Sequence, residues 1–172
     1  RIWNVEKTEI LENGDAHVVL TIEGKEFNGI RGEIDTIVGE KLTQTLKTKN
    51  GDKSLEMSMA IHNYWSVSDV TKVKVYGLED VKFTEKAKNT KEHSEKPLMI
   101  YGPIDRVYHN TEGKITVEDP GFGRKFTLER TGSKSVIVWN CWEDAKNLSD
   151  MPDDDYMKYL CVETGNALTE TI

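Results

Sequence analysis

His62 stands in a stretch, residues 57–69, whose alternating pattern is typical of a β-strand. On such a strand its side chain shares one face with Ser58, Ala60 and Tyr64. Small neighbours leave room beside the imidazole, as a concave ligand-binding face requires. The same pattern is also typical of a half-exposed histidine on a solvated sheet, or of a core histidine bonded to a carbonyl. His62 is therefore one candidate for acid–base chemistry.

Glu163 is a second candidate for acid–base chemistry, near the end of the stretch YMKYLCVETGN. If residues 159–163 form a strand, Tyr159, Cys161 and Glu163 lie on one of its faces. A glutamate among apolar neighbours has a raised pKa, which suits a general base near neutral pH. The alternative interpretation is a carboxylate at a strand end that caps the following turn.

Asp105 and two tryptophans complete the set of candidate residues. Asp105 lies in GPIDRVY, where an aspartate at a turn into a strand is also expected to pair with Arg106. Trp139 and Trp142 in VWNCW are suited either to core packing or to stacking against a sugar ring. From the residues alone, the sequence indicates a histidine, a glutamate and an aspartate as separate acid–base candidates.

The overall composition limits the classes of partner. The chain has 172 residues and a formal net charge of −7, which argues against binding to a nucleic-acid backbone. No apolar run is long enough to span a bilayer, so no membrane partner is expected. The two cysteines, Cys141 and Cys161, are too few for a disulfide framework and lack the spacing of metal ligands. We therefore expect a reduced, cytoplasmic protein with no metal and no cofactor.

The elements that must position these candidates are mainly strands. Short β-branched stretches recur between glycine- and proline-containing turns, which predicts an all-β sandwich or barrel. The expected strands are residues 17–24, 40–50, 57–69, 70–78, 97–110, 113–119, 124–130 and 135–142.

Three local features qualify this all-strand pattern. The NGD turn at residues 50–52 predicts a hairpin between the strands on either side of it. Residues 142–150 and 151–159 are expected to form short helices. Residues 84–96 are charged and predict a solvated loop in which His93 is exposed.

Three stretches of the sequence resemble the aldose 1-epimerase superfamily, in particular its glucose-6-phosphate 1-epimerase (hexose-6-phosphate mutarotase) branch. The first is MAIHNYWSVSDVTKVKVYGLEDVKF at residues 59–83, and the second is IDRVYHN at 104–110. The third, at 136–167, keeps the order Trp-Asn-x-Trp, Asp-Asp-x-Tyr and Cys-Val-Glu. It departs from the superfamily at Cys141, where the relatives have proline.

The resemblance implies a fold and a function. The implied fold is an antiparallel β-sandwich of the galactose mutarotase-like (supersandwich) type, with one or two short helices. The implied activity is the interconversion of α and β anomers of a hexose 6-phosphate, with His62 as general acid and Glu163 as general base. Asp105 is implied to bind sugar hydroxyls, and no cofactor is needed. The expected partner is a small sugar phosphate, and the full-length protein is expected to be a monomer.

Two other functions remain open at this point. One is a non-catalytic carbohydrate-binding β-sandwich that uses Trp139 or Trp142 for stacking and Asp105 for hydroxyl groups. The other is a mutarotase for unphosphorylated aldoses. A pair of opposed acid and base side chains distinguishes a mutarotase from a lectin, which needs only stacking and hydrogen bonds.

The resemblance also predicts that residues 1–172 form a single, incomplete domain. The chain begins where the superfamily has just passed a His-Gly-Phe-x-Arg segment, so the phosphate-binding residues are expected upstream of Arg1. One or two strands are also expected after residue 167. Because a sandwich without these strands exposes sheet edges and apolar surface, we expect the isolated piece to be inactive and prone to aggregate.

Overall fold

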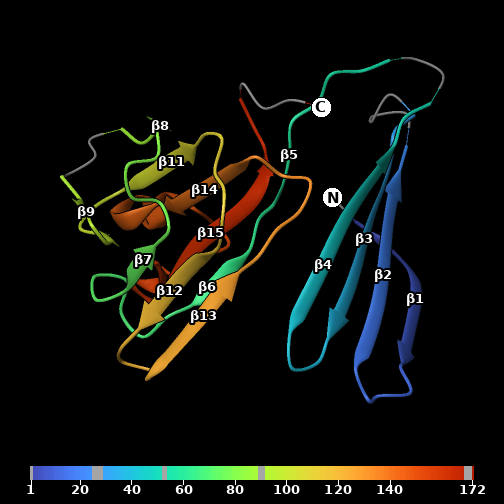
Figure 1. The fold of residues 1–172 in the computed structure, drawn as a ribbon, viewed down its shortest axis with the longest axis horizontal. Helices are drawn as coiled ribbons and strands as arrows, with labels where there is room; N and C mark the ends of the chain where they lie inside the picture. Colours follow the sequence, from blue (N-terminus) through green and yellow to red (C-terminus); the bar gives the residue numbers. More distant parts are fainter. Residues whose placement is uncertain (1, 25–28, 52–53, 89–91, 169–171) are drawn as a thin grey trace. The chain divides into compact units, whose positions relative to one another are not determined.

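The computed structural model describes residues 2–24, 29–51, 54–88, 92–168 and 172. Contacts between residues divide the chain into two compact units, Arg1–Glu56 and Met57–Ile172. Each unit is built from antiparallel strands, which confirms the predicted all-β class (Figure 1). The expectation that residues 1–172 form a single domain stays a prediction.

The first unit is a four-stranded antiparallel sheet in the order β1-β2-β3-β4. Its strands are β1 (Asn4–Ile10), β2 (Ala16–Glu23), β3 (Arg31–Val38) and β4 (Leu42–Lys49). The predicted strands 17–24 and 40–50 are therefore present. The predicted hairpin through NGD is wrong, because β4 pairs with β3 along its whole length and the strands that follow pair elsewhere. Asp52 of that turn lies outside the described residues.

The second unit contains two further sheets. One has the order β13-β12-β7-β10-β9, and the other β5-β15-β14-β11-β8, with β6 also paired to β15. In chain order the elements are β5 (Met59–Ile61), β6 (Tyr64–Ser66), β7 (Lys74–Tyr76), β8 (Phe83–Glu85), β9 (Ser94–Glu95), β10 (Leu98–Met99), β11 (Ile104–Tyr108), β12 (Ile115–Asp119), β13 (Arg124–Leu128), β14 (Ser135–Asn140), the 3-10 helices η2 (Trp142–Asn147) and η3 (Asp155–Lys158), and β15 (Tyr159–Asn166).

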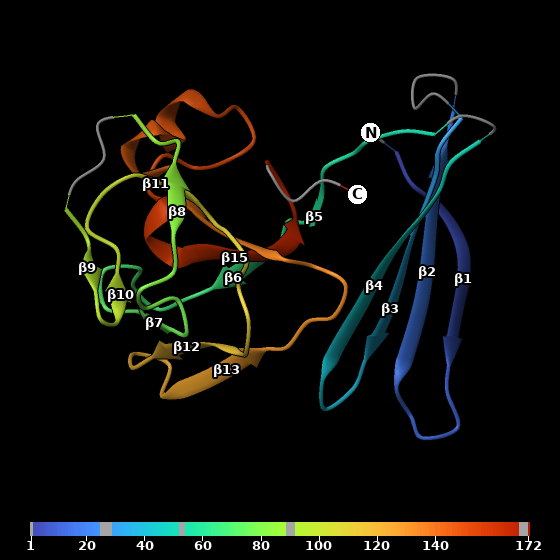
Figure 2. The ribbon, with the colours of Figure 1, turned by 45° about the horizontal axis from the view of Figure 1, so that its top comes forward.

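The hydrophobic core of the second unit lies between these two sheets. Figure 2 shows the layer with β12 and β13 apart from the layer with β6 and β15. Apolar side chains from both layers meet there, including Val75 and Val117 from one sheet and Val138, Leu160 and Val162 from the other, all fully buried. Because side chains alternate along a strand, every second residue of β11, β14 and β15 points to the opposite face of the sheet, away from this core.

Several local predictions need correction. Residues 57–69 form two short strands, β5 and β6, with a break at His62 and Asn63. The two predicted helices are short turns of 3-10 helix, η2 and η3. The predicted loop 84–96 is wrong at both ends of its described part, because β8 includes Glu85 and β9 includes Ser94.

His93 is buried, with 4% of its surface exposed, and not exposed as predicted. Its Nδ1 accepts a hydrogen bond from the Tyr101 backbone N–H at 3.2 Å. The charged residues next to it in the sequence suggested an exposed loop. One of them, Glu95, instead pairs with the buried Arg106. In the described part of the chain, no helix has the length and apolar character that a bilayer span requires.

Candidate active site

One face of the β8-β11-β14-β15 sheet gathers the polar candidates. Antiparallel register sets Asp105 opposite Trp139, and Trp139 opposite Cys161. The same register sets Ile137 opposite Glu163. Because directly opposed residues share a face, Asp105, Trp139 and Glu163 all point away from the hydrophobic core. The predicted shared face of Tyr159, Cys161 and Glu163 on β15 is thereby confirmed.

His62 reaches this face from the break between β5 and β6. Both strands pair with β15, through Ile61 opposite Thr164 and Tyr64 opposite Cys161. The intervening imidazole therefore lies beside Glu163. Its ring stacks on Tyr64 at a centroid distance of 4.8 Å, which confirms that these two residues share a face.

Gly165 permits the close approach of β5 to β15. A Cβ atom at this position would overlap the Met59 carbonyl oxygen and lie 2.7 Å from the Ala60 Cβ. Only glycine fits without displacing β5. The glycine in the ETGN stretch is thus a structural requirement for the position of the strand that leads into His62.

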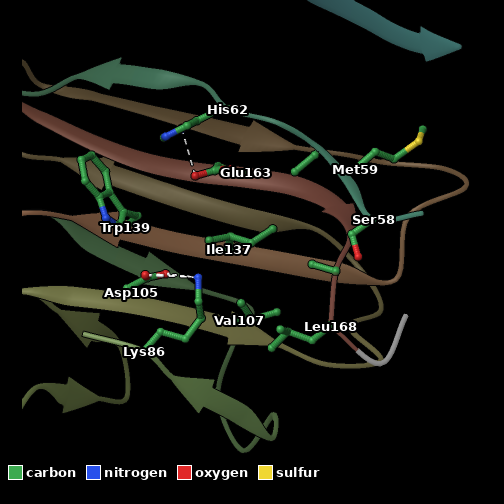
Figure 3. Close-up of a pocket in the computed structure, with 12 residues that line it drawn as sticks. Ser58, Met59, His62, Lys86, Asp105, Val107, Ile137, Trp139, Glu163 and Leu168 are labelled. Carbon is green, nitrogen blue, oxygen red and sulfur yellow. Dashed lines mark hydrogen bonds and ion pairs between the residues drawn. The ribbon is translucent and has the colours of Figure 1, made fainter. Parts of the chain in front are cut away.

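His62 and Glu163 are in direct contact. The His62 Nδ1 lies 3.0 Å from the Glu163 Oε1 (Figure 3). The imidazole is 49% exposed and the carboxyl group only 8%. The two candidates therefore converge, although their direct contact is closer than the opposed arrangement expected around a sugar ring.

Burial changes the proton affinity of both groups. Burial, and secondly the negative charge of Asp105, raises the pKa of Glu163 to about 7, while Lys86 opposes this rise. Burial lowers the pKa of His62 below its ordinary value, and Asp105 opposes this decrease. The raised pKa that the sequence predicts for Glu163 is confirmed in direction, and it makes the carboxyl group a base suited to neutral pH.

An open pocket of about 460 Å³ surrounds the pair. This volume falls in the range of small-molecule sites. The pocket is lined by Ser58, Met59, Ala60, His62, Lys86, Asp105, Val107, Ile137, Trp139, Glu163, Ala167 and Leu168. Figure 3 shows Trp139 beside the His62–Glu163 pair, and Asp105 with Lys86 on the other side of the pocket.

Asp105 pairs with Lys86, and the pairing with Arg106 that the sequence suggests is wrong. The Lys86 Nζ lies 3.2 Å from the Asp105 carboxylate. Arg106 points to the opposite face, where it donates to Glu85 and Glu95, each at 2.8 Å. Glu85 also accepts the Asp105 backbone N–H at 3.0 Å. The ion pair between the buried Arg106 and the half-buried Glu85 therefore fixes the backbone that carries Asp105.

The two tryptophans have different environments. Trp139 lines the pocket. Its ring meets the His62 imidazole edge-on, with the ring centroids 5.7 Å apart, and stacks on the Tyr159 ring at a centroid distance of 5.9 Å. Trp142 packs against the hydrophobic core and contacts Tyr156 at 5.2 Å. Only Trp139 is placed to contact a ligand in this pocket.

Lys86 is the charged residue of the pocket lining that the sequence analysis missed. It follows β8 directly, and its backbone N–H donates to the Asp105 carbonyl at 2.8 Å, which extends the pairing with β11. Lys86 was assigned to a loop because it lies in a run of charged residues, 84–96, which is typical of one. Period-2 alternation from Thr84 to Lys86, opposite the Asp-Arg-x-Tyr strand, is the pattern that could have indicated it.

Several curated proteins are similar in sequence to this chain. A relative from Cenchrus ciliaris, named "Putative glucose-6-phosphate 1-epimerase", is 30% identical over 126 residues, which make up 71% of this chain and 38% of that protein. A relative of the same name from Escherichia coli (strain K12) is 33% identical over 115 residues, or 65% of this chain and 39% of that protein. The chain spans 36% to 49% of the length of the curated relatives that it matches.

Solved structures share the fold. The crystal structure titled as a "putative mutarotase" from Salmonella typhimurium superposes with a TM-score of 0.82 at 24% identity, over 98% of this chain and 58% of that one. The family model described as aldose 1-epimerase matches residues 1–172. On this match over its whole length, the chain belongs to the aldose 1-epimerase family.

Proposed function

We propose that the pocket catalyses the interconversion of the α and β anomers of a hexose 6-phosphate, with glucose 6-phosphate as the preferred substrate. Glu163 is the general base, His62 is the general acid, and Asp105 binds sugar hydroxyls. The observation that carries this proposal is the contact between a half-exposed imidazole and a buried carboxyl group in an open pocket. Membership of the aldose 1-epimerase family supports the same class of reaction.

The reaction requires two proton transfers in each direction. Glu163 takes the proton from the C1 hydroxyl while His62 delivers a proton to the ring oxygen, and the C1–O5 bond breaks. The resulting aldehyde rotates about the C1–C2 bond. The O5 hydroxyl then returns its proton to His62 and attacks the other face of C1, while Glu163 returns its proton to the new C1 hydroxyl. Each positioned transfer is worth about 10²–10⁴ in rate.

The pair must hold one transferable proton between its two members. A protonated imidazole with a carboxylate, and a neutral imidazole with a carboxylic acid, contain the same number of protons. The 3.0 Å contact lets the proton move between these two forms without solvent. Since the Glu163 pKa is about 7 and that of His62 is lowered, we expect the rate to decrease above pH 7 as the pair loses this proton.

Two further residues of the pocket suit a sugar. Trp139 offers an aromatic surface for the apolar face of a pyranose ring. Asp105 offers a carboxylate whose ion pair with Lys86 is part-exposed and therefore open to exchange with hydroxyl groups. The preference for a phosphorylated hexose rests on the names of the relatives and on the sequence resemblance.

Anomer exchange measured by NMR tests this proposal. We expect the wild-type protein to accelerate exchange between α- and β-glucose 6-phosphate more than between the anomers of glucose. His62→Gln and Glu163→Gln should each lower kcat by about 10²–10⁴ with little change in KM. Glu129→Gln, an exposed change of the same chemistry, is the matched control.

Two outcomes would contradict the proposal. If the wild-type protein binds the sugar phosphate without accelerating exchange, the pocket is a carbohydrate-binding site. If glucose exchanges as fast as glucose 6-phosphate at equal concentration, the proposed substrate preference is wrong.

A further inference from the structure

Three side chains with different metal-binding atoms converge beside the pocket. One ligand atom each from His62, Cys161 and Glu163 lies within 4.8 Å of the other two. Cys161 and Glu163 alternate on β15, so both point to the pocket face, while His62 arrives from the break between β5 and β6. The spacing of the cysteines predicts no such site, because the third ligand is supplied by strand pairing.

The geometry is close to that of a three-ligand zinc site. Zinc binds nitrogen, oxygen and sulfur at about 2.0–2.3 Å, so two of its ligands at a tetrahedral angle lie about 3.3–3.8 Å apart. The His62 Nδ1 and Glu163 Oε1 lie 3.0 Å apart, and the widest separation in the cluster is 4.8 Å. Side-chain shifts of about 1 Å would therefore suffice.

We propose that His62, Cys161 and Glu163 form a binding site for a thiophilic divalent cation such as Zn²⁺, and that the bound ion inhibits the enzyme. Inhibition follows because a coordinated imidazole and a coordinated carboxylate can no longer transfer protons to and from a sugar. The inhibition rests on the proposed function, whereas the binding does not.

The donor set selects the class of cation. A thiolate and an imidazole favour zinc and similar borderline metals, whereas Mg²⁺ requires a shell of oxygen ligands. The Cys161 thiol is fully buried, so its pKa is raised and it is protonated in the metal-free protein. The incoming ion forms the sulfur–metal bond and releases the thiol proton to solvent.

Access to the site is through the pocket. The His62 imidazole and the Tyr64 ring stack over this part of the sheet, and each is about half exposed. Movement of these two rings would admit an ion without disturbing the core-facing residues of β15. Solvent or a substrate hydroxyl would complete the coordination from the open side.

Cobalt absorption tests the binding independently of catalysis. Co²⁺ bound to a thiolate gives a near-ultraviolet charge-transfer band, which we expect to saturate with the wild-type protein and to disappear with excess Zn²⁺. Cys161→Ser should abolish the band. Cys141→Ser should retain the band, because Cys141 lies outside the cluster. Its Sγ forms a hydrogen bond with the Tyr159 hydroxyl at 3.1 Å. Absence of the wild-type band, or its loss in Cys141→Ser alone, would overturn the proposal.

His62→Gln provides a test that leaves the buried strand intact. Loss of a group that hydrogen-bonds to a metal ligand already weakens metal sites about 10–100-fold, so loss of a direct ligand should raise the Co²⁺ dissociation constant by at least about tenfold. An unchanged dissociation constant would remove His62 from the site and refute the proposed ligand set.

Inhibition of anomer exchange separates this inference from the proposed function. Zn²⁺ should inhibit in competition with glucose 6-phosphate, Mg²⁺ at the same concentration should not, and Cys161→Ser should raise the inhibitory Zn²⁺ concentration at least about tenfold relative to its own uninhibited rate. A cobalt band without catalysis refutes the proposed function alone. Catalysis without a cobalt band or zinc inhibition refutes the metal site alone.

Discussion

Replacement of Glu163 by glutamine should make the protein more stable at alkaline pH. The folded state holds the Glu163 proton up to a pKa of about 7, whereas the ordinary value is 4.5. Between these values the folded protein binds more protons than the unfolded chain, so the free energy of unfolding decreases as the pH increases. The amide cannot ionise, and Glu163→Gln therefore lacks this decrease.

The expected magnitude follows from the two pKa values. A rise from 4.5 to about 7, at 1.36 kcal/mol for each pKa unit, corresponds to about 3 kcal/mol. This conversion is appropriate because only 8% of the side chain is exposed. The glutamine is nearly isosteric and can still form a hydrogen bond with the His62 Nδ1, so little packing energy changes. The loss of stability in the wild-type protein should be complete by about pH 8.

Urea unfolding followed by tryptophan fluorescence measures this effect. The free energy of unfolding of Glu163→Gln minus that of the wild type should increase by about 3 kcal/mol from pH 4.5 to pH 8. Titrating groups that are distant from Glu163 cancel in this difference, and an NMR titration of His62 in both proteins accounts for the group in direct contact with it. For Glu129→Gln, whose side chain is exposed, the difference should stay within about 0.5 kcal/mol. A change below about 1 kcal/mol for Glu163→Gln would show that burial does not raise this pKa.

Three further changes test the surroundings of the pair. Asp105→Asn removes a negative charge that raises the Glu163 pKa, so an NMR titration of the Glu163 carboxyl carbon should give a lower pKa than in the wild type. Lys86→Gln removes the opposing positive charge and should raise that pKa, and a shift of the same sign in both variants would refute this electrostatic account. Gly165→Ala should lower the free energy of unfolding in urea by about 1–3 kcal/mol, because the added Cβ would overlap β5. Gly51→Ala should be nearly neutral, because a Cβ there would lie 3.8 Å from its nearest neighbour, the Gly29 carbonyl oxygen.

Local pattern predicted the parts of the site that lie within one strand. Alternation along residues 159–163 correctly assigned Glu163 to the face opposite Leu160 and Val162, because a strand has a period of two whatever it pairs with. Alternation also correctly grouped His62 with Tyr64, even though the strand breaks between them.

Non-local pairing is what local pattern could not predict. The Asn-Gly signal at residues 50–51 indicated a hairpin, but eight register pairs between β3 and β4 outweigh one favourable turn. His93 and Lys86 were assigned to a solvated loop because their neighbours are charged. His93 is nevertheless buried, next to Glu95, which pairs with Arg106. Lys86 lines the pocket, where it pairs with Asp105. Local pattern does not reveal either partner, because both lie on β11. The proximity of His62 to Cys161 is non-local for the same reason.

The chemistry of the pocket depends on the core behind it. Leu160 and Val162 are fully buried in the sandwich, so they hold the register of β15. A shift by one residue would turn Glu163 into the core and bring apolar side chains to the pocket face. Burial of the apolar core stabilises the fold, and this gain offsets the free energy needed to keep the Glu163 carboxyl group partly dehydrated beside His62. A core substitution that loosens β15 should reduce the pKa rise of Glu163 before the sandwich unfolds.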